Sequence, residues 1–328
     1  MKQINVLFLY RSCKELEISS GFYYSYEYHF FFSALKRNPR INVTYLKAGP
    51  NFDVSSLNKK FDIILLYENR NVCEPDTITG LNKLDTPVIA QLSDAWDALD
   101  FDHESFHENW KINAYFNFFP SEYVYKFYPK KYKYKVITGW LEKSLYENVK
   151  QFDLRKKNKI LNSGAIGRTN LKSRLMIKLF KSKYSDPLTF YKLRTLCNKL
   201  PYVDYTPTLQ HEYVGDKYPK LLEQYSFAIA AATNVYSPKY FEIPAAGCMT
   251  FMESTDENYT KSLGYVDNEN CIFINEKNYQ MKFQEYFDDK NNLKWKQIAE
   301  NGRTFALENF NNDLGINSLV DLMEELLK

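Results

Sequence analysis

The 328-residue sequence has few of the residues that interrupt regular structure, form disulfides or bind metals. Glycine and proline number only 11 and 12, which excludes fibrous and low-complexity chains. The five cysteines are scattered and form no Cys-x-x-Cys pair, so the sequence predicts reduced thiols rather than a disulfide framework or a zinc knuckle. We therefore expect a cytoplasmic protein.

Long apolar runs and a strong excess of one charge are also missing. No segment approaches the roughly 20 apolar residues of a membrane span, and the apolar run 4–10 predicts a β-strand rather than a signal peptide. Because 43 basic and 40 acidic side chains give a net charge of only +3, composition predicts no nucleic-acid partner. Aromatic content is high at 17%, and the length allows two domains with separate cores.

Short apolar runs alternate with helix-length segments, which is typical of parallel, doubly wound α/β sheets. The polar stretch 146–159 interrupts this pattern and predicts a linker, so we expect domains at 1–150 and 151–328. Two amphipathic helices are predicted between 291 and 328, within the second domain. The predicted strands are 4–10, 41–46, 61–67, 86–92, 114–119, 135–139, 159–164, 188–193, 227–232, 248–253 and 271–275.

The stretch 221–253 contains the clearest sign of a ligand site. Its pattern predicts a strand, a polar loop, a helix that starts after Pro238 and ends at Gly247, and a second strand. In parallel α/β sheets, ligands bind where strands end and helices begin. Glu242 lies on a helix otherwise made of Tyr, Phe, Ile, Pro and Ala, where a carboxylate needs a partner or a ligand.

The sequence SGAIGRTNLKSR, residues 163–174, predicts a strand that ends in a glycine-containing loop before a helix. Backbone amides at Gly164 and the cations Arg168 and Lys172 suit a diphosphate, and Arg174 is an alternative contact. An ordinary strand-to-helix turn with solvated charges is the competing interpretation.

Asp94 lies just after the predicted strand 86–92, in the sequence VIAQLSDAWD. A carboxylate at this edge could orient or deprotonate an acceptor hydroxyl, or it could cap the following helix. Gly21 lies in a polar loop after the first strand, where a single glycine is equally compatible with a turn of no function.

The segment KYFEIPAAGCMTFME, residues 239–253, resembles the donor-site segment of glycosyltransferases of the GT-B fold. The resemblance is greatest to the retaining simple glycosyltransferases that include the spore-maturation proteins. It implies an α/β protein with two Rossmann-like domains that face each other across a cleft, followed by C-terminal helices. It also implies transfer of a sugar from a nucleotide diphosphate donor to a hydroxyl acceptor, with retention at the anomeric carbon and no essential metal or other cofactor.

The resemblance also implies roles for single residues. Glu242 would bind the ribose hydroxyls, and Asp94, Arg168 and Lys172 would take part in catalysis. The positions assigned to donor binding are Gly21, Gly164, Arg168, Lys172, Arg174, Ser237, Lys239, Tyr240 and Glu242. Many relatives carry a second glutamate and a histidine at the positions that Asn234 and Ser93 occupy here. A nucleotide-sugar epimerase, a phosphorylase of the same fold, and a nucleotide-sugar binding protein without catalysis therefore remain alternatives.

Two further patterns have competing interpretations. HESFH, residues 103–107, matches the His-Glu-x-x-His zinc motif, but its polar, acidic surroundings favour a solvated helix, so we predict no metal site. Residues 121–135 interleave aromatic residues with lysines. Such a stretch suits an anionic membrane that presents a lipid-linked acceptor, an acidic glycan or polysaccharide, single-stranded nucleic acid, or a solvated surface, and the last is favoured.

Overall fold

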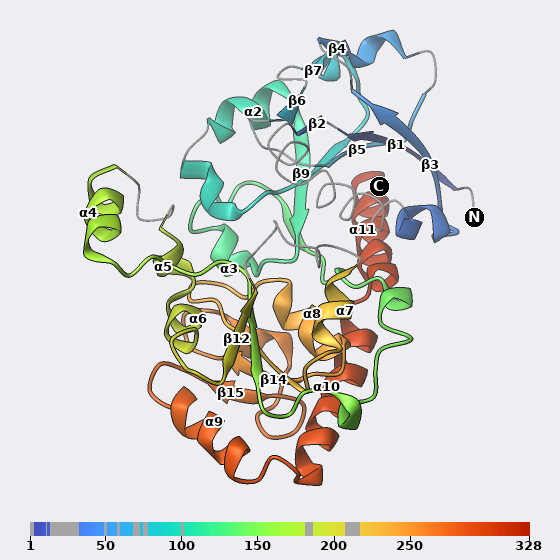
Figure 1. The fold of residues 1–328 in the computed structure, drawn as a ribbon. Coiled ribbons are helices and arrows are strands. Elements are labelled where there is room, and N and C mark those ends of the chain that lie inside the picture. The colour runs from blue at the N-terminus through green and yellow to red at the C-terminus, as the bar shows by residue number, and fades with distance from the viewer. Residues whose placement is uncertain are drawn as a thin grey trace. The chain divides into compact units, whose positions relative to one another are not determined.

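The computed structural model describes residues 3–10, 12–13, 33–48, 51–57, 60–67, 73–74, 78–99, 102–180, 186–206 and 217–328. The chain forms two compact units (Figure 1). The first contains Met1–Gly139 and Asn312–Lys328, and the second contains Trp140–Asn311.

The first unit is built on a six-stranded parallel sheet with the order β10-β9-β8-β5-β1-β3. The central strand β1 pairs with β3 on one side and β5 on the other, and Val6 lies opposite Val43 and Ile63. These apolar strands are covered on both faces, as a parallel sheet requires. The strands are β1 Ile4–Tyr10, β3 Ile41–Lys47, β5 Ile63–Tyr67, β8 Val88–Gln91, β9 Ile112–Asn117 and β10 Tyr134–Val136.

Short elements surround this sheet. Two small pairs lie outside it: β2 with β6 is antiparallel, and β4 with β7 is parallel. Residues 33–37 are helical and end before Pro39, as the sequence predicts. The other elements are β2 Ser12–Cys13, β4 Phe52–Asp53, η1 Val54–Ser56, β6 Cys73–Glu74, β7 Ile78–Thr79, η2 Leu81–Lys83, η3 Ala95–Leu99, α2 His103–Asn109 and α3 Ser121–Val124.

The last helix, α11 (Asn312–Leu326), belongs to the first unit, whereas the sequence-based boundary placed it in the second. Its apolar face, which includes Leu319 and Met323, is fully buried in the core of the first sheet. A Cβ atom on Gly315 would lie 2.4 Å from the Cα atom of Gly139, so this helix approaches the end of the first segment closely. Residues 312–328 therefore complete the first core.

The stretch 146–159 is part of the second unit rather than a linker, because the boundary lies at Gly139 and Trp140. Phe152 is buried in the second core. The buried Arg155 guanidinium donates to the carbonyl oxygen of Lys150 and lies 3.7 Å from the sulfur of Cys248. The polar sequence therefore predicted a linker, although one buried aromatic side chain and one buried arginine hold this segment in the second unit.

The second unit contains a five-stranded parallel sheet with the order β12-β11-β13-β14-β15. Its core combines strand residues such as Phe227 and Phe251 with Phe283, Tyr286 and Trp295 from two helices. The strands are β11 Ile160–Ser163, β12 Val203–Thr206, β13 Phe227–Ala230, β14 Met249–Glu253 and β15 Ile272–Ile274. The other elements are η4 Lys143–Leu145, η5 Phe152–Leu154, α4 Leu171–Phe180, α5 Pro187–Phe190, α6 Lys192–Cys197, α7 Tyr218–Leu222, α8 Lys239–Ala245, η8 Thr260–Leu263, α9 Tyr279–Asp288 and α10 Leu293–Asn309.

The predicted strand 188–193 is wrong, because this segment forms α5 and the start of α6. The side chain of Asp186 accepts a hydrogen bond from the backbone N–H of Leu188, and Pro187 occupies the first turn. This capping pair starts a helix despite the apolar pattern that follows. The edge strand β12, which the sequence analysis missed, pairs with β11 instead.

Helix α8 begins and ends as predicted, after Pro238 and before Gly247, whose φ of 74° suits glycine. Pro244 lies inside this helix and cannot donate to the carbonyl oxygen of Tyr240 one turn earlier. The hydroxyl of Tyr265 donates to that oxygen at 2.7 Å. A tyrosine from outside the helix thus replaces the missing backbone bond. No helix in the described ranges is long and apolar enough to cross a membrane.

Candidate donor site

Polar side chains gather at the carboxyl end of β11 and β13 in the second unit. The chain turns after β11 at Gly164, whose φ is 102°. A Cβ atom there would lie 2.7 Å from Cε of Lys239 and 2.9 Å from Nη1 of Arg194. The backbone conformation therefore favours glycine at this position, and the two cationic side chains lie close beside it.

Arg194 of α6 joins the ends of the two strands and is only 2% exposed. Its guanidinium donates to the carbonyl oxygen of Ala165 at 3.2 Å and to that of Ala231 at 2.6 Å. It also lies over the ring of Tyr191, 4.3 Å from the centroid. Its Nε atom is buried and has no hydrogen-bond partner in the described part of the chain. The sequence analysis missed this residue because it assigned the preceding segment to a strand.

Helix α8 supplies Lys239 and Glu242, which are three residues apart and therefore share one side of the helix. Burial lowers the pKa of Lys239 to about 8, the Glu242 carboxylate opposes this shift, and Arg194 adds to it. The Lys239 ammonium lies 4.8 Å from the ring centroid of Tyr218. The Tyr218 hydroxyl is 2.6 Å from that of Ser163 at the end of β11.

Glu242 is 7% exposed, and its carboxylate makes no hydrogen bond or ion pair with another described residue. Burial raises its pKa, and Lys239 lowers it. A buried carboxylate without a hydrogen-bond donor is costly, so it is a candidate for ligand binding. The sequence analysis identified this residue for the same physical reason.

Ser237 and Tyr240 occupy different environments, although both were assigned to donor binding. The Ser237 hydroxyl is buried and has no partner among the described residues. The Tyr240 hydroxyl accepts from the N–H of Ala232 and donates to the carbonyl oxygen of Glu253, both at 3.1 Å. Because Tyr240 is two positions from Glu242, it points to the opposite side of α8. Its side chain supports the core and does not line the site.

Of the cations predicted from the glycine loop, Arg168 precedes α4, whereas Lys172 and Arg174 lie in its first turn. Arg168 and Lys172 are exposed and make no ion pair in the described ranges. Arg174, the alternative diphosphate contact, forms an ion pair with the buried carboxylate of Asp186. Arg168 and Lys172 therefore remain available to a ligand, whereas Arg174 already has an anionic partner.

The strand next to β13 ends in a second buried carboxylate, Glu253, which is 2% exposed. Burial raises its pKa to about 7, and Arg194 acts in the opposite direction. One carboxylate oxygen has no hydrogen-bond partner within the described chain. Glu253 is thus a second buried carboxylate in this unit, and it interacts electrostatically with Arg194.

Two predicted residues belong to the first unit. Asp94 is half-buried in the connection from β8 to η3, and its carbonyl oxygen accepts from the N–H of Asp97 at 2.9 Å. Ser93 beside it is 6% exposed. Gly21 lies outside the described residues. The role of Asp94 stays a prediction, since it is not on the same unit as Glu242.

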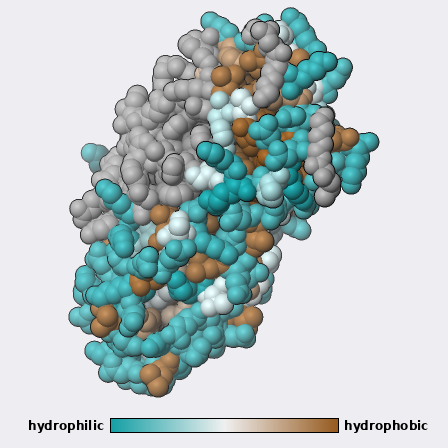
Figure 2. Space-filling model, turned by 90° about the vertical axis from the view of Figure 1, so that its right-hand side faces the viewer, coloured by the Kyte–Doolittle hydropathy of each residue, from teal (hydrophilic) through white to brown (hydrophobic). Residues whose placement is uncertain are grey.

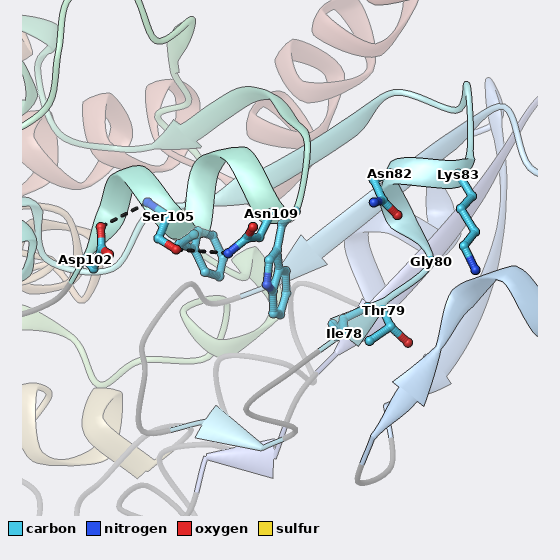
Figure 3. A pocket seen from close by; sticks show the side chains of 10 residues that line it. Ile78, Thr79, Gly80, Asn82, Lys83, Asp102, Ser105 and Asn109 are labelled. Carbon is cyan, nitrogen blue, oxygen red and sulfur yellow. Dashed lines mark hydrogen bonds between the residues drawn. The ribbon is translucent and has the colours of Figure 1, made fainter.

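A cavity of about 550 Å³ with both polar and apolar lining residues lies on the first unit between α2 and the β7–η2 segment. Asp102, Ser105 and Asn109 lie on the α2 side, and Asn82 and Lys83 lie on the opposite side (Figure 3). Ser105 receives a 2.9 Å hydrogen bond from Asn109, and its N–H donates to Asp102 at 3.0 Å. These contacts stabilise α2, and the residues include none of those predicted for the site.

The HESFH motif forms α2, where His107 packs among tyrosines. Its ring stacks on Tyr132 with centroids 3.8 Å apart, and its Nδ1 atom is 3.1 Å from the hydroxyl of Tyr115. Burial lowers the pKa of His107, and Lys131 adds to the shift. In the described ranges no group of three or more His, Cys, Asp or Glu side chains is placed to hold a metal ion.

Solved structures resemble the whole chain in fold. At the sequence level no protein family and no curated protein matches it. A glycosyltransferase from Rickettsia africae superposes over 100% of both chains, with a TM-score of 0.57 and 11% identity. An α-glucosyltransferase in complex with UDP covers 98% of this chain and 100% of its own, with a TM-score of 0.60 and 10% identity. HepE from Anabaena in complex with UDP has the same coverage, a TM-score of 0.56 and 12% identity, and it has also been solved with UDP-glucose.

Identities of this size show the fold alone. The predicted α/β architecture, with two Rossmann-like parallel sheets of the GT-B type and C-terminal helices, is confirmed. The retaining subfamily, which rested on residues 239–253, stays a prediction.

Proposed function

We propose that the chain is a glycosyltransferase that uses a UDP-sugar as donor and a hydroxyl group as acceptor. The observation that carries this proposal is Glu242, a buried carboxylate without a hydrogen-bond donor at the carboxyl edge of the second sheet. A nucleotide ribose offers two neighbouring hydroxyl donors, which such a carboxylate can accept. UDP is favoured over other nucleotides because fold neighbours were solved with UDP or UDP-glucose.

The cations around Glu242 suit the diphosphate. Lys239 and Arg194 approach the backbone at Gly164, exposed Arg168 lies on the connection that follows, and exposed Lys172 lies at the start of α4. In the reaction, the bond from the anomeric carbon to the diphosphate breaks, a bond to the acceptor oxygen forms, and the acceptor proton leaves. Positive charge stabilises the negative charge that develops on the departing UDP. Asp94 is the candidate to receive the acceptor proton.

Calorimetry with UDP tests the role of Glu242. Glu242→Ala should raise the Kd about ten- to a hundredfold, because one or two charge-assisted hydrogen bonds are lost. The fold should be retained, since the variant also removes a carboxylate that is costly to bury. Glu257→Gln, at an exposed position of the same unit, is the matched control. An unchanged Kd in Glu242→Ala would remove this residue from the donor site.

Turnover distinguishes a transferase from a protein that only binds nucleotide sugars. Sugar transfer to an added acceptor, with release of UDP, supports the transferase. Binding of UDP-sugar without transfer or hydrolysis supports the binding protein. Interconversion of the donor sugar without an acceptor supports an epimerase.

The proposal includes sugar transfer without a metal ion, because lysine and arginine side chains already supply positive charge for the diphosphate. Transfer should persist in excess EDTA and in the double variant His103→Ala, His107→Ala. Activity that is abolished by EDTA, restored by zinc or manganese, and lost in the double variant would instead make α2 a metal site.

A further inference from the structure

Helix α4 carries four large apolar side chains that face solvent. Leu171, Leu175, Met176 and Leu179 are 87, 58, 51 and 64% exposed. The three leucines are spaced four residues apart, so they form one stripe with Met176 beside it. Half-buried side chains, including Arg174 and its ion pair, lie on the other side of the helix. We call these four exposed residues the α4 stripe.

The α4 stripe is unlike the rest of the described surface. Other exposed large apolar side chains, such as Leu154, Met281 and Leu293, lie singly on different elements. On the face drawn in Figure 2, hydrophobic residues of the second unit form small separate groups among hydrophilic ones. Figure 1 shows α4 projecting away from the sheet of its own unit. A contiguous apolar surface of this kind indicates an interaction site.

Positive charge accompanies the stripe. The sequence has basic residues at 168, 172, 174, 178, 181 and 183 and no acidic residue from 164 to 185. Arg168 and Lys172 are exposed and have no ion pair within the described chain. A short helix with an apolar side and a local excess of lysine and arginine has the character of a helix that lies in a membrane interface.

We propose that α4 docks the protein on an anionic lipid surface, with the α4 stripe inserted among the lipids and basic residues contacting the headgroups. Charge favours this occupant over a second copy of the chain. Two α4 helices in contact would bring like charges together without acidic residues to compensate them, whereas an anionic bilayer attracts them.

The sequence suggested a membrane contact at residues 121–135, but this stretch exposes few of the apolar side chains that insertion into a membrane requires. Tyr123, Val124, Tyr128 and Tyr132 are at most 4% exposed and pack in the first unit. Lys133 is held by Glu325 at 2.7 Å. This stretch therefore offers cations but few apolar side chains to a membrane, and α4 offers both.

Vesicle co-sedimentation tests the proposal. The full chain should bind vesicles of phosphatidylcholine with phosphatidylserine, bind pure phosphatidylcholine far less, and lose binding as salt is raised. Leu175→Ser with Leu179→Ser should weaken binding on the order of tenfold or more, because two inserted leucines are removed. Met281→Ser with Leu293→Ser removes exposed apolar side chains from α9 and α10 and should bind like the wild type.

Each other result overturns the proposal. Absence of wild-type binding to anionic vesicles removes the membrane as partner, and equal binding by both double variants removes α4 as the site. Sedimentation velocity supplies a separate measurement. Self-association that Leu175→Ser with Leu179→Ser abolishes, without vesicle binding, would identify the stripe as a contact between copies. Circular dichroism and UDP binding confirm that the variants are folded.

Discussion

The two units differ in how they treat charge in their interiors. Among the described residues, every buried charged side chain belongs to the second unit: Glu142, Arg155, Asp186, Arg194, Glu242 and Glu253. The buried polar side chains of the first unit are uncharged: Asn38, Ser93, Asn117 and Asn312. Removing a charge from water costs free energy. A buried charge is therefore retained where its interactions within the fold, or with a ligand, offset this desolvation cost.

One comparison isolates this difference. In the first unit, the Asn117 amide donates to the carbonyl oxygen of Leu92 at 2.5 Å and accepts from the N–H of Phe118 at 2.6 Å. In the second unit, Arg194 bonds the strand-end carbonyls of Ala165 and Ala231. A neutral amide thus satisfies backbone groups at a strand end in one unit, whereas the other unit uses a cation. The guanidinium also places positive charge at this end of the second sheet, which fits the proposed diphosphate site.

The largest predicted effect on stability comes from Arg194. Arg194→Met should destabilise the second unit by about 3–5 kcal/mol, because two buried carbonyl oxygens lose charge-assisted donors. Asn117→Ala should destabilise the first unit by only about 1–3 kcal/mol, since its bonds are neutral. Hydrogen exchange of the strands in each unit measures the two losses separately.

A smaller loss in Arg194→Met than in Asn117→Ala would break this comparison. It would mean that the desolvation cost of the guanidinium exceeds what its hydrogen bonds contribute, so that Arg194 serves the ligand at the expense of the fold.

The second prediction concerns pH. The folded-state pKa of Glu253 is about 7, raised from 4.5, so the folded chain retains a proton that the unfolded chain has lost between these values. Stability from this group is therefore complete below pH 4.5 and is lost as pH rises through 7. Glu253→Gln mimics the protonated form. Its stability relative to wild type should increase by roughly 2–4 kcal/mol between pH 5 and pH 8.

Met252→Leu provides the control at a neighbouring buried position. It changes packing without changing charge, so its difference from wild type should be the same at both pH values. The stability difference between Glu253→Gln and wild type could instead be the same at pH 5 and pH 8. That result would show that Glu253 is already ionised in the folded chain at pH 5, and that the second unit stabilises its carboxylate as well as water does.

Most strands were predictable because an apolar run between turn residues fixes a buried strand locally. Helix α8 was predictable from Pro238 and Gly247, and Glu242 from a single carboxylate in an apolar helix. Arg194 was not, because the cap formed by Asp186 and Pro187 outweighed the strand-like pattern after it. The packing of α11 was hidden for another reason. An amphipathic pattern shows that a helix has a buried face, but not which sheet that face covers.

The smallest predicted effect concerns neutral groups, for which the units should behave alike. Tyr265→Phe removes the donor to the Tyr240 carbonyl oxygen, which Pro244 leaves without a backbone N–H, and should cost about 1–2 kcal/mol. In the first unit the Tyr134 hydroxyl similarly donates to the carbonyl oxygen of Phe119 at 2.7 Å, so Tyr134→Phe should cost a comparable amount.

A double-mutant cycle with Pro244→Ala tests the cause of the Tyr265 effect, because alanine at 244 restores an N–H that can bond the Tyr240 oxygen within α8. In that background Tyr265→Phe should cost clearly less than in the wild type, as measured by hydrogen exchange in the second unit. An equal cost in both backgrounds would mean that the Tyr265 hydroxyl stabilises the unit through another contact. A much larger cost for Tyr265 than for Tyr134 would extend the difference between the units from charged to neutral groups.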